Sequence, residues 1–292
     1  MIVLDIGGTK IAIARWVDGR LSGRTQIPMP ATEPEWRSAI RSLALKYPAA
    51  GRLGVAVTGS TDGQMIKAIN RSVISFWDGY PLAAFLEDCW RCPVSLLNDA
   101  QAAAWGEFVV HAQARESLLF ITLSTGVGGG LVLDGKLRVG HLGLAGHVGH
   151  VSTAMKPLDG DVTCGCGRLN CLETIASGAA LARQASRLAG TAKDAVSVFA
   201  GYHAGDQVAS QLVANAALAV AHQIADSHAT LGIDRVCIGG SVGLARGMID
   251  AVVSAQQTLP PLFRVPVQAA LLREDAGLIG VGHWVNHEGQ GR

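Results

Sequence analysis

Charged residues are scarce in this sequence, and neither sign predominates. They make up 16% of the 292 residues, and 24 Lys and Arg against 23 Asp and Glu leave a net charge of +1. No run of like charge stands out along the chain. The sequence therefore indicates neither a nucleic-acid-binding surface nor attachment to an anionic membrane.

A long uninterrupted apolar run is also missing. The most apolar stretch, residues 212–232, is broken by one Asn, one Asp and two His, which predicts a buried helix rather than a membrane span. Strand-like sequence begins at Ile2 and leaves no room for a secretory leader. We therefore expect a cytoplasmic protein.

Cysteine is rare as well, but its distribution is uneven. The chain has six cysteines, and three of them fall within the stretch CGCGRLNC, from Cys164 to Cys171. In a reducing compartment, such a cluster predicts metal binding or catalysis rather than a disulfide framework.

The length and an internal repeat both point to two lobes. A single core rarely grows beyond about 250 to 300 residues. Residues 2–27 have the pattern of strand, glycine turn, strand, Asp-Gly turn and strand, and residues 118–140 repeat it. Helical spacing at 35–47 and 81–90 adds β-α alternation. We interpret the repeat as a duplication and expect an α/β protein of two similar lobes around a central cleft.

Each copy of the repeat contains a glycine-rich turn that could hold a polyphosphate. Glycine lets backbone N–H groups approach an anion, and threonine adds a hydroxyl donor. The predicted nucleotide-binding residues are Asp5, Gly7, Gly8, Thr9 and Lys10 in the first turn, Thr125, Gly126, Gly128, Gly129 and Gly130 in the second, and Gly239 and Gly240 in a third, weaker turn. We expect this third turn, residues 237–247, to follow a strand and open a helix. Each turn alone is equally consistent with a simple structural turn, and none matches the P-loop pattern.

Two carboxylates are candidates for chemistry at strand ends. Asp5 could hold Mg²⁺ partly through water. Asn98 and Asp99 follow a predicted strand and precede an alanine-rich helix, and an aspartate there could orient an attacking hydroxyl and accept its proton. The alternative is that Asn98 and Asp99 only cap the helix. A cap requires one such residue, and the sequence supplies two.

The cysteine cluster lies close in sequence to a histidine. His150 with Cys164, Cys166 and Cys171 forms a Cys₃His set, which is the donor set of a structural zinc site. Zinc would stiffen the glycine-rich segment 146–173, and with it His147 and Glu173, which could face a sugar. A second partition would combine the CxxC pair Cys89 and Cys92 with Cys164 and Cys166, but a packing role is more common for such a pair.

These motifs together resemble the ROK family of sugar kinases and repressors. DIGGTK, NDA, STGVGGG, GHVGH, CGCGRLNC and GGSVG occur in the family's order between Asp5 and about Gly243. The resemblance implies an actin-like (ribonuclease H-like) duplicated two-lobe ATPase fold, with ATP, Mg²⁺, structural zinc and usually a homodimer. It implies an N-terminal lobe at 1–115, completed by a helix at about 275–292, and a C-terminal lobe at 116–274.

The resemblance also implies roles for individual residues. Asp99 corresponds to the catalytic base. The residues expected to bind the sugar are Asn70, Asn98, Asp99, His147, His150 and Glu173. His147 stands where family glucokinases usually have Glu, and Asn170 replaces a common Gly before the last cysteine. A left-handed backbone is more tolerable for Asn than for most residues.

With His147, the sequence is similar to the bacterial N-acetylmannosamine kinases of sialic acid degradation. We therefore expect phosphorylation of N-acetylmannosamine at its 6-hydroxyl. The alternatives are a glucokinase or another N-acetylhexosamine kinase of the same family, and a non-catalytic sugar-sensing protein. A DNA-binding repressor is disfavoured, because family repressors carry an additional segment before the first strand.

Overall fold

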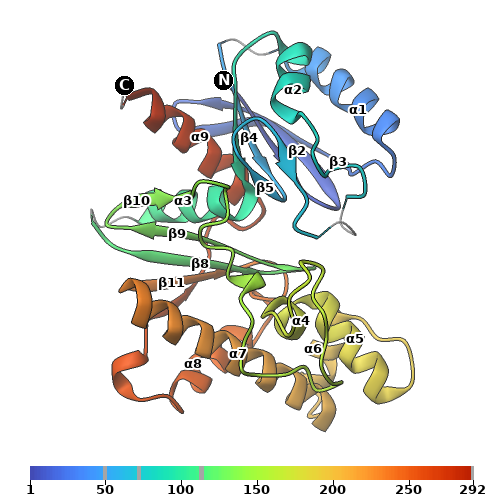
Figure 1. Ribbon diagram of the computed structural model, residues 1–292, viewed down its shortest axis with the longest axis vertical. Helices are drawn as coiled ribbons and strands as arrows, with labels where there is room; N and C mark the ends of the chain where they lie inside the picture. Colours follow the sequence, from blue (N-terminus) through green and yellow to red (C-terminus); the bar gives the residue numbers. More distant parts are fainter. Residues whose placement is uncertain (49–50, 71–73, 112–114, 291–292) are drawn as a thin grey trace. The chain divides into compact units, whose positions relative to one another are not determined.

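The computed structural model describes residues 1–48, 51–70, 74–111 and 115–290, which fold into two compact units. The first unit comprises Met1–Ala112, Leu137–Ala145 and Glu274–Arg292. The second comprises Gln113–Lys136 and Gly146–Arg273. Figure 1 draws both units with the labels used below.

The first unit is built on a five-stranded sheet of order β3-β2-β1-β4-β7. Its strands are β1 (Ile2–Ile6), β2 (Lys10–Val17), β3 (Arg20–Pro28), β4 (Leu53–Val57) and β7 (Val94–Asn98). The first three form the predicted antiparallel meander, and β4 and β7 continue the sheet in parallel. A small hairpin of β5 (Ser60–Thr61) and β6 (Ile66–Lys67) follows β4.

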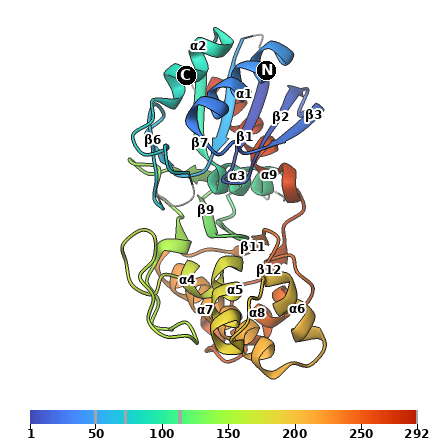
Figure 2. The same ribbon diagram turned by 90° about the vertical axis from the view of Figure 1, so that its right-hand side faces the viewer.

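Helices cover both faces of this sheet, because successive side chains of a strand point to opposite faces. Helices α1 (Glu33–Lys46) and α2 (Leu82–Trp90) cover one face, and α3 (Asp99–His111) and α9 (Ala276–Gln290) cover the other (Figures 1 and 2). Leu4 belongs to the core with Trp36 of α1, whereas its neighbour Val3 belongs to a separate core with Leu278 of α9.

The second unit repeats this topology. Its sheet has the order β10-β9-β8-β11-β12. The strands are β8 (Leu118–Leu123), β9 (Val127–Leu133), β10 (Lys136–Arg138), β11 (Arg235–Gly239) and β12 (Val267–Ala269). Only Lys136 of the edge strand β10 belongs to the second unit, and the chain then continues into the segment Leu137–Ala145 of the first. An antiparallel pair, β8 with β9, is again continued in parallel by two later strands. The predicted duplicated, actin-like α/β fold class is therefore confirmed.

Helices pack against one face of the second sheet. They are α4 (Glu173–Ala176), α5 (Gly178–Ala189), α6 (Ala195–His203), α7 (Gln207–Leu231) and α8 (Met248–Gln256), with 3₁₀ turns η1 (Val148–His150) and η2 (Pro261–Phe263), and η3 (Arg273–Asp275) at the junction with α9. The core joins Leu119, Ile121 and Leu123 of β8 to α7 and its neighbours. By length and composition alone α7 could cross a membrane, but 61% of its most apolar window is buried in the unit, as predicted for a core helix.

The glycine turn at 237–247 is placed as the sequence predicts. It begins within β11, continues through turns after Gly240, and ends at Gly247, the residue before α8. Gly247 adopts a left-handed conformation there, with φ of 84°. The segment therefore follows a strand and opens a helix.

Candidate active site

The first glycine turn, Gly7 to Thr9, joins β1 to β2 at the carboxyl end of β1. The N–H of Gly7 donates to the carbonyl of Lys10 over 3.0 Å, and the N–H of Met29 donates to the carbonyl of Thr9 over 2.9 Å. The segment thus forms a hairpin turn, which was the alternative to a phosphate-binding role. Thr9 at its tip is exposed.

Two carboxylates of the first unit, Asp5 and Asp99, have raised pKa values. Burial and then the charge of Asp99 raise the pKa of Asp5 to about 7, against the opposing effect of Lys10. Burial also raises the pKa of Asp99. Two carboxylates with raised pKa values suit a hard divalent cation. Such a cation prefers oxygen ligands, and its charge stabilises the ionised form of each carboxylate. The residues present therefore fit Mg²⁺.

Asn98 and Asp99 make different contacts at the start of α3. The Oδ1 atom of Asn98 accepts the N–H of Gln101 over 3.0 Å, which is the hydrogen bond of an N-cap. The Nδ2 atom of Asn98 donates to Oδ1 of Asp99 over 3.0 Å, and the N–H of Ala100 donates to the same oxygen over 2.8 Å. Asn98 thus caps the helix, and Asp99 is an oriented carboxylate beside it.

Gln101 is a structural residue of this site that the sequence reasoning missed. Its side chain is fully buried, and Nε2 donates to the carbonyls of Val139, Gly143 and Ala145 over 3.2, 3.2 and 2.8 Å. These bonds hold the segment Leu137–Ala145 against α3, two residues after Asp99 in the helix. A buried amide requires hydrogen-bond partners, but no local signal in the sequence indicates that Gln101 is buried or which carbonyls it contacts.

The second glycine turn lies between β8 and β9 and is tightly packed. The N–H of Ser124 donates to the carbonyl of Gly126 over 2.9 Å. Gly129, predicted as a phosphate-binding residue together with Gly128 and Gly130, lies on β9. A Cβ there would stand 2.4 Å from the carbonyl oxygen of Gly146. At least part of this glycine run is thus required by backbone packing against the segment that carries His150.

The third glycine turn lies against the end of β8, next to the second. Gly240 has φ of 85°, and a Cβ there would be 2.2 Å from the carbonyl oxygen of Leu123. The N–H groups of Val242 and Gly243 donate to that oxygen over 2.9 and 3.0 Å. Gly239, at the end of β11, packs against the ring of Phe120. The second unit thus brings two of the predicted nucleotide turns together.

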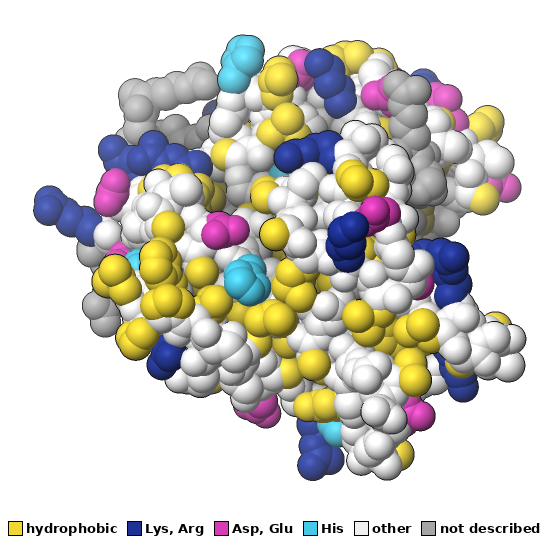
Figure 3. Space-filling view, turned by 60° about the horizontal axis from the view of Figure 1, so that its bottom comes forward, with side chains coloured by type: hydrophobic (Ala, Val, Ile, Leu, Met, Phe, Trp, Pro, Cys, Tyr) yellow, Lys and Arg dark blue, Asp and Glu magenta, His cyan; other side chains and the backbone are white. Residues whose placement is uncertain are grey.

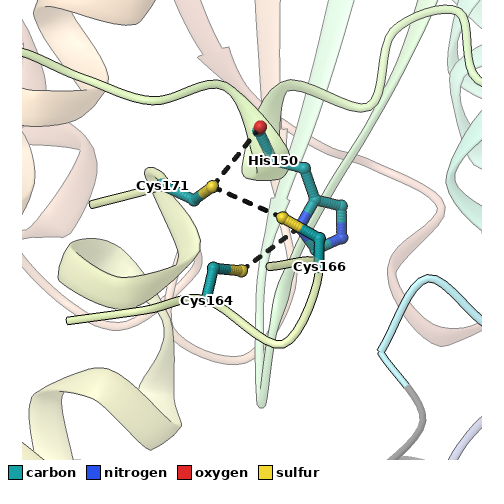
Figure 4. A group of neighbouring side chains, drawn as sticks. All are labelled: His150, Cys164, Cys166 and Cys171. Atoms are coloured by element: carbon teal, nitrogen blue, oxygen red, sulfur yellow. Dashed lines mark hydrogen bonds between the residues drawn. The ribbon is translucent and has the colours of Figure 1, made fainter. Parts of the chain in front are cut away.

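The predicted zinc ligands converge in the second unit (Figure 4). The ligand atoms of His150, Cys164, Cys166 and Cys171 all lie within 4.8 Å of one another. Nδ1 of His150 is 3.5 Å from Sγ of Cys164, and Sγ of Cys166 is 3.6 Å from Sγ of Cys171. Thiolates around one tetrahedral zinc ion lie about 3.8 Å apart. The donor set and its spacing fit zinc.

The protonation of this cluster is compatible with a metal as well. Burial lowers the pKa of His150, which favours the neutral imidazole that binds metals. Burial raises the pKa of Cys164 and Cys171, so a metal ion is needed to stabilise their thiolates. Cys89 and Cys92 belong to the first unit, at the end of α2. The donor atoms that lie together are those of the Cys₃His set, rather than those of the alternative set with Cys89 and Cys92.

The metal ligands are not the only groups that hold the segment 146–173. Asn170 adopts φ of 48°, its Oδ1 accepts the N–H of Val162 over 3.0 Å, and its Nδ2 donates to Asp161 over 2.9 Å. Arg183 of α5 donates two hydrogen bonds, of 3.0 and 3.2 Å, to the carboxylate of Asp159. Asn at position 170 therefore adopts the left-handed backbone that was expected, and it anchors the loop with its side chain.

The remaining predicted sugar ligands are divided between the units. Glu173 is the first residue of α4, and His147 is partly buried before η1, where its carbonyl accepts the N–H of His150 over 3.1 Å. Asn70 lies in the first unit, after β6.

Lys, Arg, Asp and Glu side chains are interspersed on the face in Figure 3, in agreement with the small net charge.

Comparison with known proteins identifies relatives along nearly the entire chain. Residues 1–288 match the ROK family. The chain is 40% identical over 286 residues to a protein named N-acetylmannosamine kinase from Yersinia pestis (strain Pestoides F), covering 97% of both chains.

Solved structures share the same fold. The ROK hexokinase from Thermus thermophilus superposes with a TM-score of 0.86 at 32% identity, covering 100% of both chains. A ROK family glucokinase from Streptomyces griseus, solved with glucose and AMPPNP, has a TM-score of 0.78 at 27% identity, covering 97% of this chain and 98% of that one.

Proposed function

Since the chain belongs to the ROK family, we propose that it is an ATP-dependent kinase that phosphorylates the 6-hydroxyl of N-acetylmannosamine, in sialic acid degradation. The observation that carries this proposal is the 40% identity, over 97% of both chains, to the Yersinia pestis protein of that name. The names of the Thermus and Streptomyces relatives support the broader assignment to sugar phosphorylation.

Asp99 is proposed as the residue that accepts the proton of the attacking hydroxyl. Its Oδ1 is held by Asn98 and by the N–H of Ala100, so the carboxylate has a defined direction. In phosphoryl transfer the transition state is loose, and positioning of the nucleophile contributes more than base strength. The raised pKa of Asp99, caused by burial, makes it a better proton acceptor than an exposed aspartate.

Asp5 and the glycine turns are proposed to bind the nucleotide. Asp5 would hold Mg²⁺ with water in the remaining positions, and the bound ion would neutralise charge on the phosphates. Lys10 lowers the pKa of Asp5 by its charge and would favour an anionic ligand in the same region. Backbone N–H groups of the turns at Gly8 and Gly126 and at Gly240 would donate to the nucleotide.

Sugar selection is proposed to depend on the segment that carries the metal site. His150, Cys164, Cys166 and Cys171 would hold a structural zinc ion, which would fix His147 and Glu173 for contact with the sugar. Where family glucokinases usually have a carboxylate, His147 supplies an imidazole, which can donate as well as accept a hydrogen bond. We infer that this change alters which substituents at C1 and C2 of the sugar are accepted.

A coupled assay of ADP release with purified protein tests the proposal. Turnover with N-acetylmannosamine should exceed turnover with N-acetylglucosamine and glucose. Glucose is the specific alternative, because the Streptomyces relative is a glucokinase solved with that sugar. Glucose turnover far above that of N-acetylmannosamine would refute the assignment of the substrate and leave sugar phosphorylation intact.

We further propose that the protein is a cytoplasmic homodimer without a nucleic-acid or membrane partner. This follows from the family resemblance and from the balanced charge of +1. Light scattering on the purified protein gives the mass of the particle, for which twice 30.3 kDa is expected.

A further inference from the structure

Glu173 joins the metal-binding segment to the second glycine turn. Its Oε2 atom accepts the N–H of Val127, the first residue of β9, over 3.0 Å. Its Oε1 atom lies 3.9 Å from Sγ of Cys164. One carboxylate therefore contacts both the metal cluster and the backbone that leaves the glycine turn.

The space around this carboxylate leaves no room for adjustment. A Cβ on Gly126 would lie 2.6 Å from Oε2 of Glu173, and a Cβ on Gly149 would lie 1.9 Å from the carbonyl oxygen of Val127. Because Gly149 precedes the metal ligand His150, the backbone of the metal-binding segment is packed directly on Val127. A shift of either segment must move the other.

The same turn is held from its other side by α5. The N–H of Gly178 donates to the carbonyl of Ser124 over 2.7 Å, and the N–H of Ala179 donates to the carbonyl of Thr125 over 3.2 Å. Glu173 lies five residues before Gly178, on α4. The turn Ser124 to Gly126 is thus enclosed by elements that continue from the metal-binding segment.

We propose that Glu173 is a positioning residue for the nucleotide turn, and that it links occupancy of the metal site to nucleotide affinity. This inference rests on the proposed function, because it takes the turn Ser124 to Gly126 to be a phosphate-binding one. The carboxylate predicted to meet the sugar then also holds the nucleotide turn. Sugar affinity and nucleotide affinity are therefore coupled through one side chain.

The sign of the effect distinguishes this role from simple electrostatics. A carboxylate near phosphates repels them, so its removal alone would leave nucleotide affinity unchanged or increase it. If Glu173 positions the turn, its removal weakens nucleotide binding. Glutamine in its place retains an oxygen that can accept the N–H of Val127 and should preserve the turn.

The experiment is isothermal titration of AMPPNP into the zinc-loaded protein with Mg²⁺ and without sugar. Glu173→Ala should weaken AMPPNP binding about fivefold or more, whereas Glu173→Gln should stay within about twofold of wild type. Removing zinc from wild type with a chelator should weaken binding in the same direction. Circular dichroism on each sample establishes that it is folded.

Glu116→Ala is the matched control. Glu116 is a partly buried carboxylate of the same unit that pairs with Arg235 over 2.8 Å, and it lies before β8, at the opposite end from Ser124. Its replacement should leave AMPPNP affinity unchanged. Wild-type affinity in Glu173→Ala, or equal losses in the Ala and Gln variants, would overturn the inference. Failure of wild type to bind AMPPNP would instead contradict the proposed function.

Discussion

Replacing Asp5 by Asn should stabilise the protein increasingly as the pH rises. Burial and the charge of Asp99 raise the pKa of Asp5 from 3.8 to about 7. The folded state therefore holds this proton more tightly than the unfolded state. The stability that the proton confers is fully present below about pH 4 and is lost as the pH rises through 7.

The magnitude follows from the difference between the two pKa values. A separation of about three pH units corresponds to about 4 kcal/mol, at about 1.4 kcal/mol per unit. Asn does not ionise, so Asp5→Asn avoids this loss. The free energy of unfolding of Asp5→Asn, minus that of wild type, should therefore increase between pH 4 and pH 7 and remain constant above pH 7. The total increase should be about 4 kcal/mol.

Urea unfolding of both proteins between pH 4.5 and 8.5, without Mg²⁺ or nucleotide, measures this difference. Asp88→Asn is the control, because Asp88 is a surface residue with 58% of its side chain exposed, and its replacement should change stability by less than about 0.5 kcal/mol at every pH. A difference between Asp5→Asn and wild type that does not vary with pH would refute the reasoning. Mg²⁺ should reduce the difference, since a bound cation stabilises the ionised carboxylate.

Three further substitutions test the site, and a fourth serves as a control for the last of them. Asp99→Asn should retain AMPPNP and sugar binding in titrations and lose turnover by about 10² or more, and turnover near wild type would exclude a proton-accepting role. Cys166→Ser should lose zinc, measured by elemental analysis, and raise the KM for the sugar, and full zinc content would remove Cys166 from the ligand set. Gly277→Ala places a Cβ 2.6 Å from Oδ2 of Asp5 and should raise the Mg²⁺ concentration needed for half-maximal AMPPNP binding. Gly280→Ala, which meets Ala102 of α3 instead, should lower stability without that change in Mg²⁺ dependence.

The features that the sequence predicts well are those that neighbouring residues determine. The meander over β1, β2 and β3 follows from alternating apolar residues and from the turn at Asp18 and Gly19, where φ is 48° and 79°. The metal cluster was also accessible, because its donors lie between His150 and Cys171, and a short loop can bring them together. The alternative that Asn98 caps the helix was visible for the same reason, and it is realised for Asn98.

Contacts between distant segments were not accessible in this way. Nothing local to Glu173 indicates that its carboxylate accepts the N–H of Val127, 46 residues earlier. The three bonds of Gln101 to the segment 139–145 also depend on tertiary packing. The close packing of Gly240, where a Cβ would lie 2.2 Å from the carbonyl oxygen of Leu123, is likewise a contact between distant segments.

Duplication of the fold has not produced two equivalent glycine turns. Asp5 is the penultimate residue of β1, and Thr122 is the penultimate residue of β8, so only the first copy carries a carboxylate at this position. In the first unit, Gly277 allows α9 to approach Asp5, whereas in the second unit Gly129 allows the metal-binding segment to approach β9. The same strand-turn-strand sequence therefore supports a carboxylate in one unit and a metal-anchored backbone in the other. A motif repeated in the sequence identifies the common fold, and the chemistry of each copy is determined by the later segments that pack against it.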